Sequence, residues 1–146
     1  MSSPVGGVAD DEPSGDEADL LAANAAFYRA FEAADLDAMS DLWEHSDRVE
    51  CVHPGWSALR GWGEVAASWA TLFGGRQRLQ FILTDARAVA VGDVGWVSVD
   101  ENLLAGDVTG GSGTTGTVAA INVFVRRAGR WRMVAHHGAP VAGRAG

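Results

Sequence analysis

The sequence predicts an α+β fold in which three N-terminal helices pack on one face of a strongly curved antiparallel sheet. Apolar residues recur at helical spacing through most of the first half of the chain and alternate with polar residues through the second half. Short turn sequences separate the alternating segments, as expected for hairpins. Helices followed by hairpins are typical of α+β domains rather than of doubly wound sheets. Because the helices can cover only one face, we expect the sheet to curl around them and to leave a conical cavity.

The composition is that of one globular domain. The chain has 146 residues, of which 47% are hydrophobic and 21% are charged, so it can bury a proper core. Its formal charge of −8 disfavours nucleic acid as a partner. The single cysteine, Cys51, excludes an intrachain disulfide, and there is neither a secretory signal nor an apolar run of membrane-spanning length. We therefore expect a cytoplasmic protein without a membrane partner.

The domain is expected to span residues 15–138. Residues 1–14 are acidic and rich in Ser, Gly, Pro and Asp, which predicts a disordered leader. Residues 139–146 are mostly small and are predicted to form a flexible tail.

Capping residues and apolar stripes predict the three helices. Ser14 and Glu17 have the spacing of a capping box, so the first helix is expected over residues 15–34. Asp35 can end this helix and cap a second, short one. The third helix is expected over residues 61–73, where two glycines follow it. The residues expected on the buried stripes are Leu20, Ala23, Asn24, Phe27, Phe31, Ala34, Leu36, Met39, Leu42, Trp43, Trp62, Val65, Trp69, Leu72 and Phe73.

Five strands are expected. A short strand between the second and third helices places Val49, Cys51 and His53 on one face. A glycine-rich loop follows the third strand, and it lacks the helix that a phosphate-binding loop needs. The strands are predicted over residues 49–53, 79–91, 94–104, 117–126 and 130–137, with the glycine-rich loop at 106–113.

Three segments carry a resemblance to a known family. They are FYRAFEAADLDAMSDLW (27–43), VECVHPGWSALRGWGEVAASW (49–69) and INVFVRRAGRWRMVAHH (121–137). In their order and spacing the chain resembles the NTF2-like superfamily, the cone-shaped α+β fold of ketosteroid isomerases and SnoaL-like polyketide cyclases. The resemblance implies a small apolar ligand in the cone, no cofactor and no metal. It also implies a homodimer through the outer face of the sheet, where the central strand has a second apolar face formed by Thr117, Ala119, Ile121, Val123 and Val125.

The resemblance also implies which positions correspond to the isomerase's catalytic groups. Its oxyanion-hole tyrosine corresponds to Phe27, which cannot donate a hydrogen bond, while Tyr28 lies about 100° further around the helix. Its second oxyanion donor corresponds to Asn122, whose amide can donate. Its general base precedes a proline and corresponds to His53, with Cys51 as a rival alignment. The altered set argues against a steroid isomerase of the usual kind and leaves another proton-transfer reaction open.

His53 and Asn122 each have two interpretations. The ordinary pKa of a histidine lies near neutrality, so His53 is a candidate base or acid; the alternative is a strand-end histidine bonded to a backbone carbonyl. A buried Asn122 must find partners. These are either Tyr28, Asn24 or a water, or a ligand.

Glu101, His136 and Trp56 complete the candidate pocket. Alternation turns either Asp100 or Glu101 inward, and an inward Glu101 would have a raised pKa and could pair with a histidine; the alternative is a solvated pair near the strand end. Strict alternation places Trp131, Met133, Ala135 and His137 on one face and His136 on the other, and the resemblance turns His136 toward the cavity. Trp56 lies in a loop beside His53, where it is a pocket wall or a dimer contact.

A metal site and a cysteine nucleophile are the less favoured alternatives. His53, Glu101 and one of His136 and His137 are a possible ligand set, but no short-range ligand spacing supports it. Cys51 is expected to be inert packing.

We therefore expect a SnoaL-like small-molecule-binding protein that transfers protons on an apolar carbonyl-bearing ligand, as an isomerase or cyclase does. The alternative is a non-catalytic ligand-binding or dimerisation module of the same fold. The expected catalytic residues are His53 and Asn122, and the expected pocket residues are Phe27, Tyr28, Trp56, Trp69, Glu101, Phe124 and His136.

Overall fold

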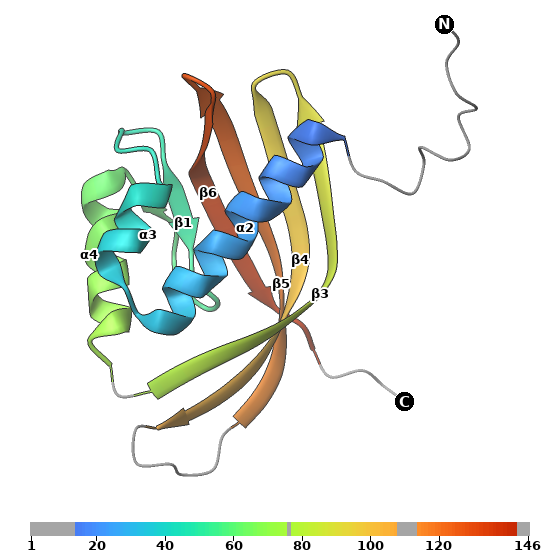
Figure 1. Ribbon diagram of the computed structural model, residues 1–146. Coiled ribbons are helices and arrows are strands. Elements are labelled where there is room, and N and C mark those ends of the chain that lie inside the picture. Colours follow the sequence, from blue (N-terminus) through green and yellow to red (C-terminus); the bar gives the residue numbers. More distant parts are fainter. Residues whose placement is uncertain (1–13, 76, 108–113, 143–146) are drawn as a thin grey trace, which may run out of the picture.

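The computed structural model in Figure 1 describes residues 14–75, 77–107 and 114–142. It confirms an α+β fold with three helices on a mostly antiparallel sheet of six strands in the order β2-β1-β6-β5-β4-β3. Most of the acidic leader, the 108–113 part of the predicted loop and the end of the tail lie outside the described residues. The elements are α2 (Gly15–Ala33), α3 (Leu36–Leu42), β1 (Glu50–Val52), β2 (Leu59–Arg60), α4 (Trp62–Phe73), β3 (Gln77–Val91), β4 (Val94–Asp107), β5 (Thr114–Arg127) and β6 (Arg130–Pro140).

The helix boundaries follow from local capping. The Ser14 side chain accepts from the Glu17 backbone at 3.1 Å while Glu17 accepts from the Ser14 backbone at 3.2 Å, so the predicted capping box is confirmed. Asp35 accepts from the Ala38 backbone at 3.0 Å and starts α3. No helix within the described ranges is long and apolar enough to cross a membrane.

Strand pairing brings the short strand β1 into the site. β1 lies parallel to β6, with Cys51 opposite His136, and antiparallel to β2, a two-residue strand that periodicity did not predict. β6 also runs to Pro140, three residues beyond its predicted end. The parallel pairing places the residues that follow β1 beside the second half of β6, although about eighty residues separate them in the chain.

Two β-bulges bend the sheet around α2, as Figure 1 shows. The β3–β4 register shifts between Thr84 and Arg87, where Asp85 has a φ of 58°. The β5–β6 register shifts where Val123 pairs with Ala135 and the next residue, Phe124, pairs with Met133. A bulge adds one residue to a strand, increases its twist and bends it. These two bulges therefore give the sheet the predicted strong curvature.

The bulge in β6 corrects one prediction. Trp131, Met133 and His136 are all buried on the inner face, whereas the His137 side chain is 44% exposed. The expectation that Trp131 and His137 share a face is therefore wrong. The extra residue, Val134, reverses the alternation of β6. Before it the odd-numbered residues Trp131 and Met133 face inward, and after it the even-numbered His136 does.

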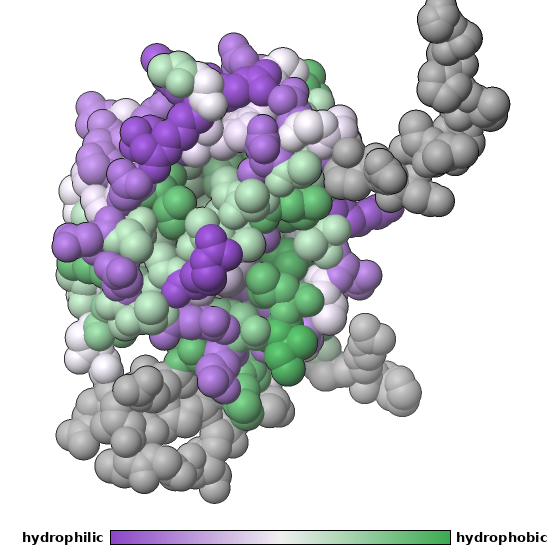
Figure 2. Space-filling model, viewed as in Figure 1, coloured by the Kyte–Doolittle hydropathy of each residue, from purple (hydrophilic) through white to green (hydrophobic). Residues whose placement is uncertain are grey.

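The helices cover the inner face of the sheet with an aromatic core. α2 crosses in front of β6, β5 and β4 in Figure 1, and it approaches β4 so closely that a Cβ on Gly95 would lie 2.5 Å from Leu20 Cδ1. In Figure 2 the same side of the molecule is polar along its upper edge, and apolar residues gather below and to the right. The fully buried large side chains include Leu20, Phe27, Met39, Trp43, Trp69, Phe124 and Met133.

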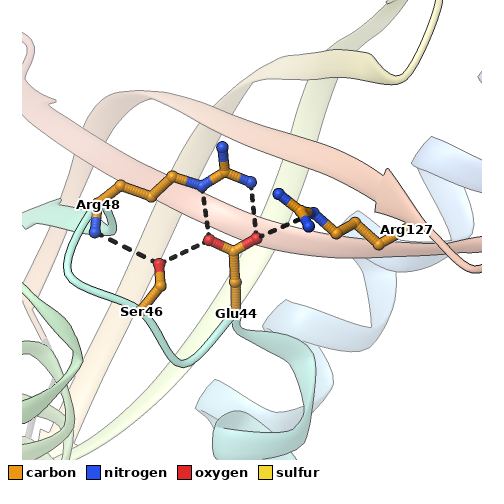
Figure 3. A network of polar contacts seen from close by, with 4 residues as sticks. All are labelled: Glu44, Ser46, Arg48 and Arg127. Atoms are coloured by element: carbon orange, nitrogen blue, oxygen red, sulfur yellow. Dashed lines mark hydrogen bonds and ion pairs between the residues drawn. The ribbon is translucent and has the colours of Figure 1, made fainter.

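An exposed ion network ties the end of α3 to the β5–β6 hairpin (Figure 3). The Glu44 carboxylate accepts two hydrogen bonds from Arg48, at 2.7 and 2.8 Å, and one from Ser46 at 2.6 Å, and it lies 3.8 Å from Arg127 Nε. The hydrogen bonds from Arg48 hold the pKa of Glu44 at about 2, well below its ordinary value. Both arginines are largely exposed, so the network contributes little to stability and mainly positions the hairpin.

Candidate functional site

Buried polar side chains mark the site. Among the described residues, six polar or charged side chains are buried in a core that is otherwise apolar. They come from α2, α4, β4, β5, β6 and the end of β1, so six separate elements contribute to one cluster. Polar groups removed from water must be paired, and their clustering at one place is typical of functional sites. The six are Asn24, His53, Ser68, Glu101, Asn122 and His136.

Five of the side chains in the core form a continuous hydrogen-bonded chain. The Tyr28 hydroxyl donates to Glu101 Oε2 at 2.5 Å. Asn122 Nδ2 lies 3.2 Å from the Tyr28 hydroxyl and 2.8 Å from Asn24 Oδ1, and it donates to both. Asn122 Oδ1 lies 2.5 Å from His136 Nδ1. Of the partners expected for Asn122, the structure shows Asn24 and Tyr28. The hydrogen-bonded chain connects a carboxyl group on β4 to an imidazole on β6.

Burial shifts the proton equilibrium of the carboxyl end of this chain. Glu101 is 3% exposed, and desolvation raises the pKa of its carboxyl to about 7, although the hydrogen bond from Tyr28 opposes the shift. Burial and the charge of Glu101 also raise the pKa of the Tyr28 hydroxyl far above its ordinary value, so Tyr28 keeps its proton. The inward Glu101 therefore pairs with a tyrosine and not with a histidine, and it can gain or lose a proton near neutral pH.

His53 lies at the other side of the cluster. Its Nε2 is 2.9 Å from Ser68 Oγ, and its ring packs edge-on against Trp56 and Trp69, each at 4.8 Å between ring centroids. The imidazole therefore bonds to a hydroxyl and not to a backbone carbonyl. Its own carbonyl accepts from the Trp56 amide at 2.8 Å across the Pro54–Gly55 turn. Burial lowers the pKa of His53 to about 4, so the ring is neutral at pH 7.

The two inward histidines face each other across the cluster. The ring centroids of His53 and His136 are 6.2 Å apart. Burial, the nearby His53 and His137 lower the pKa of His136 to about 3, so both rings are neutral at pH 7. His137 lies on the other face, 3.3 Å from Glu50. Within the described ranges, no three His, Cys, Asp or Glu side chains are placed to hold a metal ion, and His137 does not join the other candidate ligands.

Aromatic side chains enclose the polar cluster. Phe27 packs against Tyr28, Trp69 and His136 with centroid distances of 4.8, 5.6 and 4.9 Å. Trp69 and Phe124 are fully buried, whereas Trp56 is 40% exposed. Of the predicted pocket residues, Trp56 is thus the one at the surface, next to His53.

Ser68 is the site residue that the sequence reasoning missed. It is buried on the inner face of α4, beside Trp69, because it lies three residues after Val65. A serine on an otherwise apolar helical face was the available signal. Cys51 Sγ lies 3.6 Å from His53 Nε2, and burial raises the thiol pKa to about 12, so Cys51 packs as a neutral thiol.

Comparison with known proteins identifies the family. A proposed dehydratase of the NTF2-like family from Streptomyces avermitilis is 38% identical, with a TM-score of 0.81 over 90% of this chain and 100% of that chain. A proposed calcium/calmodulin-dependent protein kinase type II association domain from Thiobacillus denitrificans is also 38% identical, with a TM-score of 0.70 over 84% of this chain and 94% of that chain.

A plant protein shares the same region. The F-box protein SKIP8 of Arabidopsis thaliana is 32% identical over 118 residues, which are 81% of this chain and 48% of that protein, so the chain spans about half the length of this relative. The family of SnoaL-like domains matches residues 20–143. This family and the fold support a small-molecule-binding domain. The chain belongs to the family of SnoaL-like domains and has the NTF2-like fold.

Proposed function

We propose that this protein is an enzyme that transfers protons on an apolar, carbonyl-bearing small molecule. The observation that carries the proposal is the pair of buried, neutral histidines 6.2 Å apart, with a carboxyl group of pKa about 7 in the same cluster. General acid–base catalysis favours a group whose pKa lies near the working pH, as that of Glu101 does, and a neutral imidazole has a lone pair that can accept a proton. A 38% identical relative is a proposed dehydratase, and dehydration next to a carbonyl also begins with the removal of a proton from carbon.

In this proposal His53 is the base. Its ring is neutral, so one nitrogen carries a lone pair that can accept a proton from the ligand. His53 precedes a turn whose Trp56 is 40% exposed, and its ring packs against the Trp56 ring at 4.8 Å, so this turn is the proposed entry side for the ligand. Apolar contacts with the ligand come from Trp56 and Trp69, with Phe27 and Phe124 behind them.

Asn122 is the proposed donor to the oxygen of the ligand. Both hydrogens of its amide are used within the protein, but the bond to Tyr28 is long, at 3.2 Å, beside the 2.8 Å bond to Asn24. A ligand oxygen that gains negative charge would compete best for the hydrogen that points to Tyr28.

The test is α-proton exchange in heavy water. Apolar ketones and β-hydroxy ketones are first screened for thermal stabilisation of the protein, and hits are followed by NMR for exchange at the carbon next to the carbonyl. We expect His53→Ala to lower the exchange rate by about 10²-fold or more. His45→Ala, which removes an exposed histidine stacked on Trp62, is the matched control and should leave the rate unchanged. Equal rates in wild type and His53→Ala would refute the base assignment.

A non-catalytic ligand-binding or dimerisation module is the second candidate. It is favoured by the loss of a hydroxyl at Phe27 and by the engagement of both Asn122 amide hydrogens inside the protein. A second 38% identical relative is a proposed association domain. Stabilisation by a ketone without exchange in wild type would support this candidate.

We also propose a homodimer through the outer sheet face. On β5, Thr117, Ala119, Ile121, Val123 and Val125 face outward, and Ile121 is 40% exposed. Burial of this apolar strip would stabilise a dimer. Sedimentation at micromolar concentration should show a dimer for wild type and a monomer for Ile121→Asp. A monomeric wild type would exclude this interface, and Leu36→Asp, at the exposed start of α3 and away from this face, is the matched control.

A further inference from the structure

Hydrogen atoms in the buried chain can be placed by counting donors. Glu101 is a pure acceptor when ionised, so the short bond to it must be donated by the Tyr28 hydroxyl. A hydroxyl has a single hydrogen, and the Tyr28 oxygen can therefore only accept from Asn122. The group that lies 3.2 Å from this oxygen must be the Asn122 NH2.

This placement orients the Asn122 amide. Its second hydrogen points to Asn24 Oδ1 at 2.8 Å, which agrees with the same orientation. Asn122 Oδ1 then faces His136 Nδ1 at 2.5 Å and accepts from it. His136 is neutral and carries one ring hydrogen, which must be on Nδ1.

We propose that ionised Glu101, acting through Tyr28 and Asn122, holds His136 in the Nδ1–H tautomer and leaves Nε2 as a second proton acceptor of the site. Tyr28 and Asn24 are then positioning residues, and Asn122 positions His136 in addition to its proposed contact with the ligand. The Nδ1–H tautomer is the less common form of a neutral histidine in water, so its presence in His136 requires the acceptor that Asn122 provides.

The tautomer of His53 is fixed independently of His136, and it is the opposite one. Ser68 Oγ donates its one hydrogen to the Val65 carbonyl at 2.7 Å, one helical turn back. The Ser68 oxygen can therefore only accept from His53 Nε2, which lies 2.9 Å away. His53 carries its hydrogen on Nε2, and its lone pair is on Nδ1.

The tautomers follow from the hydrogen bonds alone, whereas the use of the two lone pairs in turnover rests on the proposed function. Both rings are neutral and have opposite tautomers, so the two acceptor atoms are His53 Nδ1 and His136 Nε2. In a proton-transfer reaction, one such group can remove a proton and a second can take part in its delivery.

The experiment is a long-range ¹H–¹⁵N correlation spectrum of the free, ¹⁵N-labelled protein at about pH 8.5, where Glu101 is ionised and both rings are neutral. The spectrum shows which nitrogen of each histidine carries the hydrogen. We expect His136 on Nδ1 and His53 on Nε2, with signals assigned by single His→Gln variants. His136 with its hydrogen on Nε2 would overturn the proposal.

Tyr28→Phe separates positioning from packing. Phenylalanine keeps the ring contacts with Phe27 and Phe81, at 4.8 and 5.2 Å, and removes the hydroxyl that links Glu101 to Asn122. His136 should then populate Nε2–H, while His53, held by Ser68, stays on Nε2 as an internal control. An unchanged His136 in Tyr28→Phe would contradict the role of Glu101 and Tyr28.

Two further variants address Asn122 itself. Asn122→Asp keeps an oxygen that accepts from His136 and should preserve Nδ1–H, whereas Asn122→Ala should lose it. If the second variant fails to fold, the wild-type and Tyr28→Phe spectra still decide. The expected tautomers together with a fully active His53→Ala would refute the proposed function and leave this inference intact.

Discussion

Trp69→Ala is expected to lower the free energy of unfolding by about 3–5 kcal/mol. Trp69 is fully buried where α4 meets α2 and the sheet. Its indole packs against Phe27, Phe31 and His53, with centroid distances of 5.6, 4.9 and 4.8 Å. Alanine would leave a cavity between rings that come from α2 and from the end of β1, and those rings cannot all move into it. Urea denaturation monitored by circular dichroism measures this decrease in the free energy of unfolding.

Two variants control for this effect. Trp69→Phe keeps most of the apolar contact and removes an indole N–H that has no acceptor among the described residues, so it should cost less than about 1.5 kcal/mol. Trp56→Ala removes the same side chain from a site that is 40% exposed, and it should also cost much less than Trp69→Ala. If Trp56→Ala were as destabilising as Trp69→Ala, the core would not be organised around Trp69.

Local chemistry accounts for what the sequence could predict of the fold. The capping box at Ser14 and the Asp35 cap are interactions within four residues, so α2 and α3 begin within one residue of their expected positions. Alternation in β5 placed Asn122 on the face opposite the apolar outer strip, whereas alternation in β4 predicted only that either Asp100 or Glu101 faces inward, and the structure turns Glu101 inward. Asn122 is the centre of the buried chain, and Glu101 is its carboxyl end.

Long-range pairing accounts for what the sequence could not predict. The bulge at Val134 depends on how β5 and β6 register with each other, and it turns His136 inward, which the family resemblance predicted and the alternation alone could not. The parallel pairing of β1 with β6 likewise has no local signal, yet it brings His53 toward His136. Alternation within one strand contains no information about an extra residue that its neighbour imposes.

Glu101→Gln is expected to change how stability depends on pH. The pKa of Glu101 is about 7 in the folded protein because of burial, against an ordinary value of 4.5. Between these two values the unfolded chain has released the proton while the folded protein retains it. Stability from this group is therefore lost as the pH rises through that window, by about 3 kcal/mol in total, and stays lost above it. Glutamine does not titrate, so the variant lacks this pH-dependent contribution to stability.

Subtracting the unfolding free energy of wild type from that of Glu101→Gln removes the contributions of His53 and His136, because these histidines titrate in both proteins. The contribution of Glu101 remains. Unfolding free energies of wild type and Glu101→Gln, measured from about pH 5 to about pH 8.5, should diverge by about 2–3 kcal/mol in favour of the variant as the pH rises. Glutamine can still accept from Tyr28, so a constant offset is expected and the slope is the readout. Parallel curves for wild type and Glu101→Gln would mean that Glu101 is ionised throughout this pH range. The carboxylate could then act only as a fixed acceptor for Tyr28, and not as a proton donor at neutral pH.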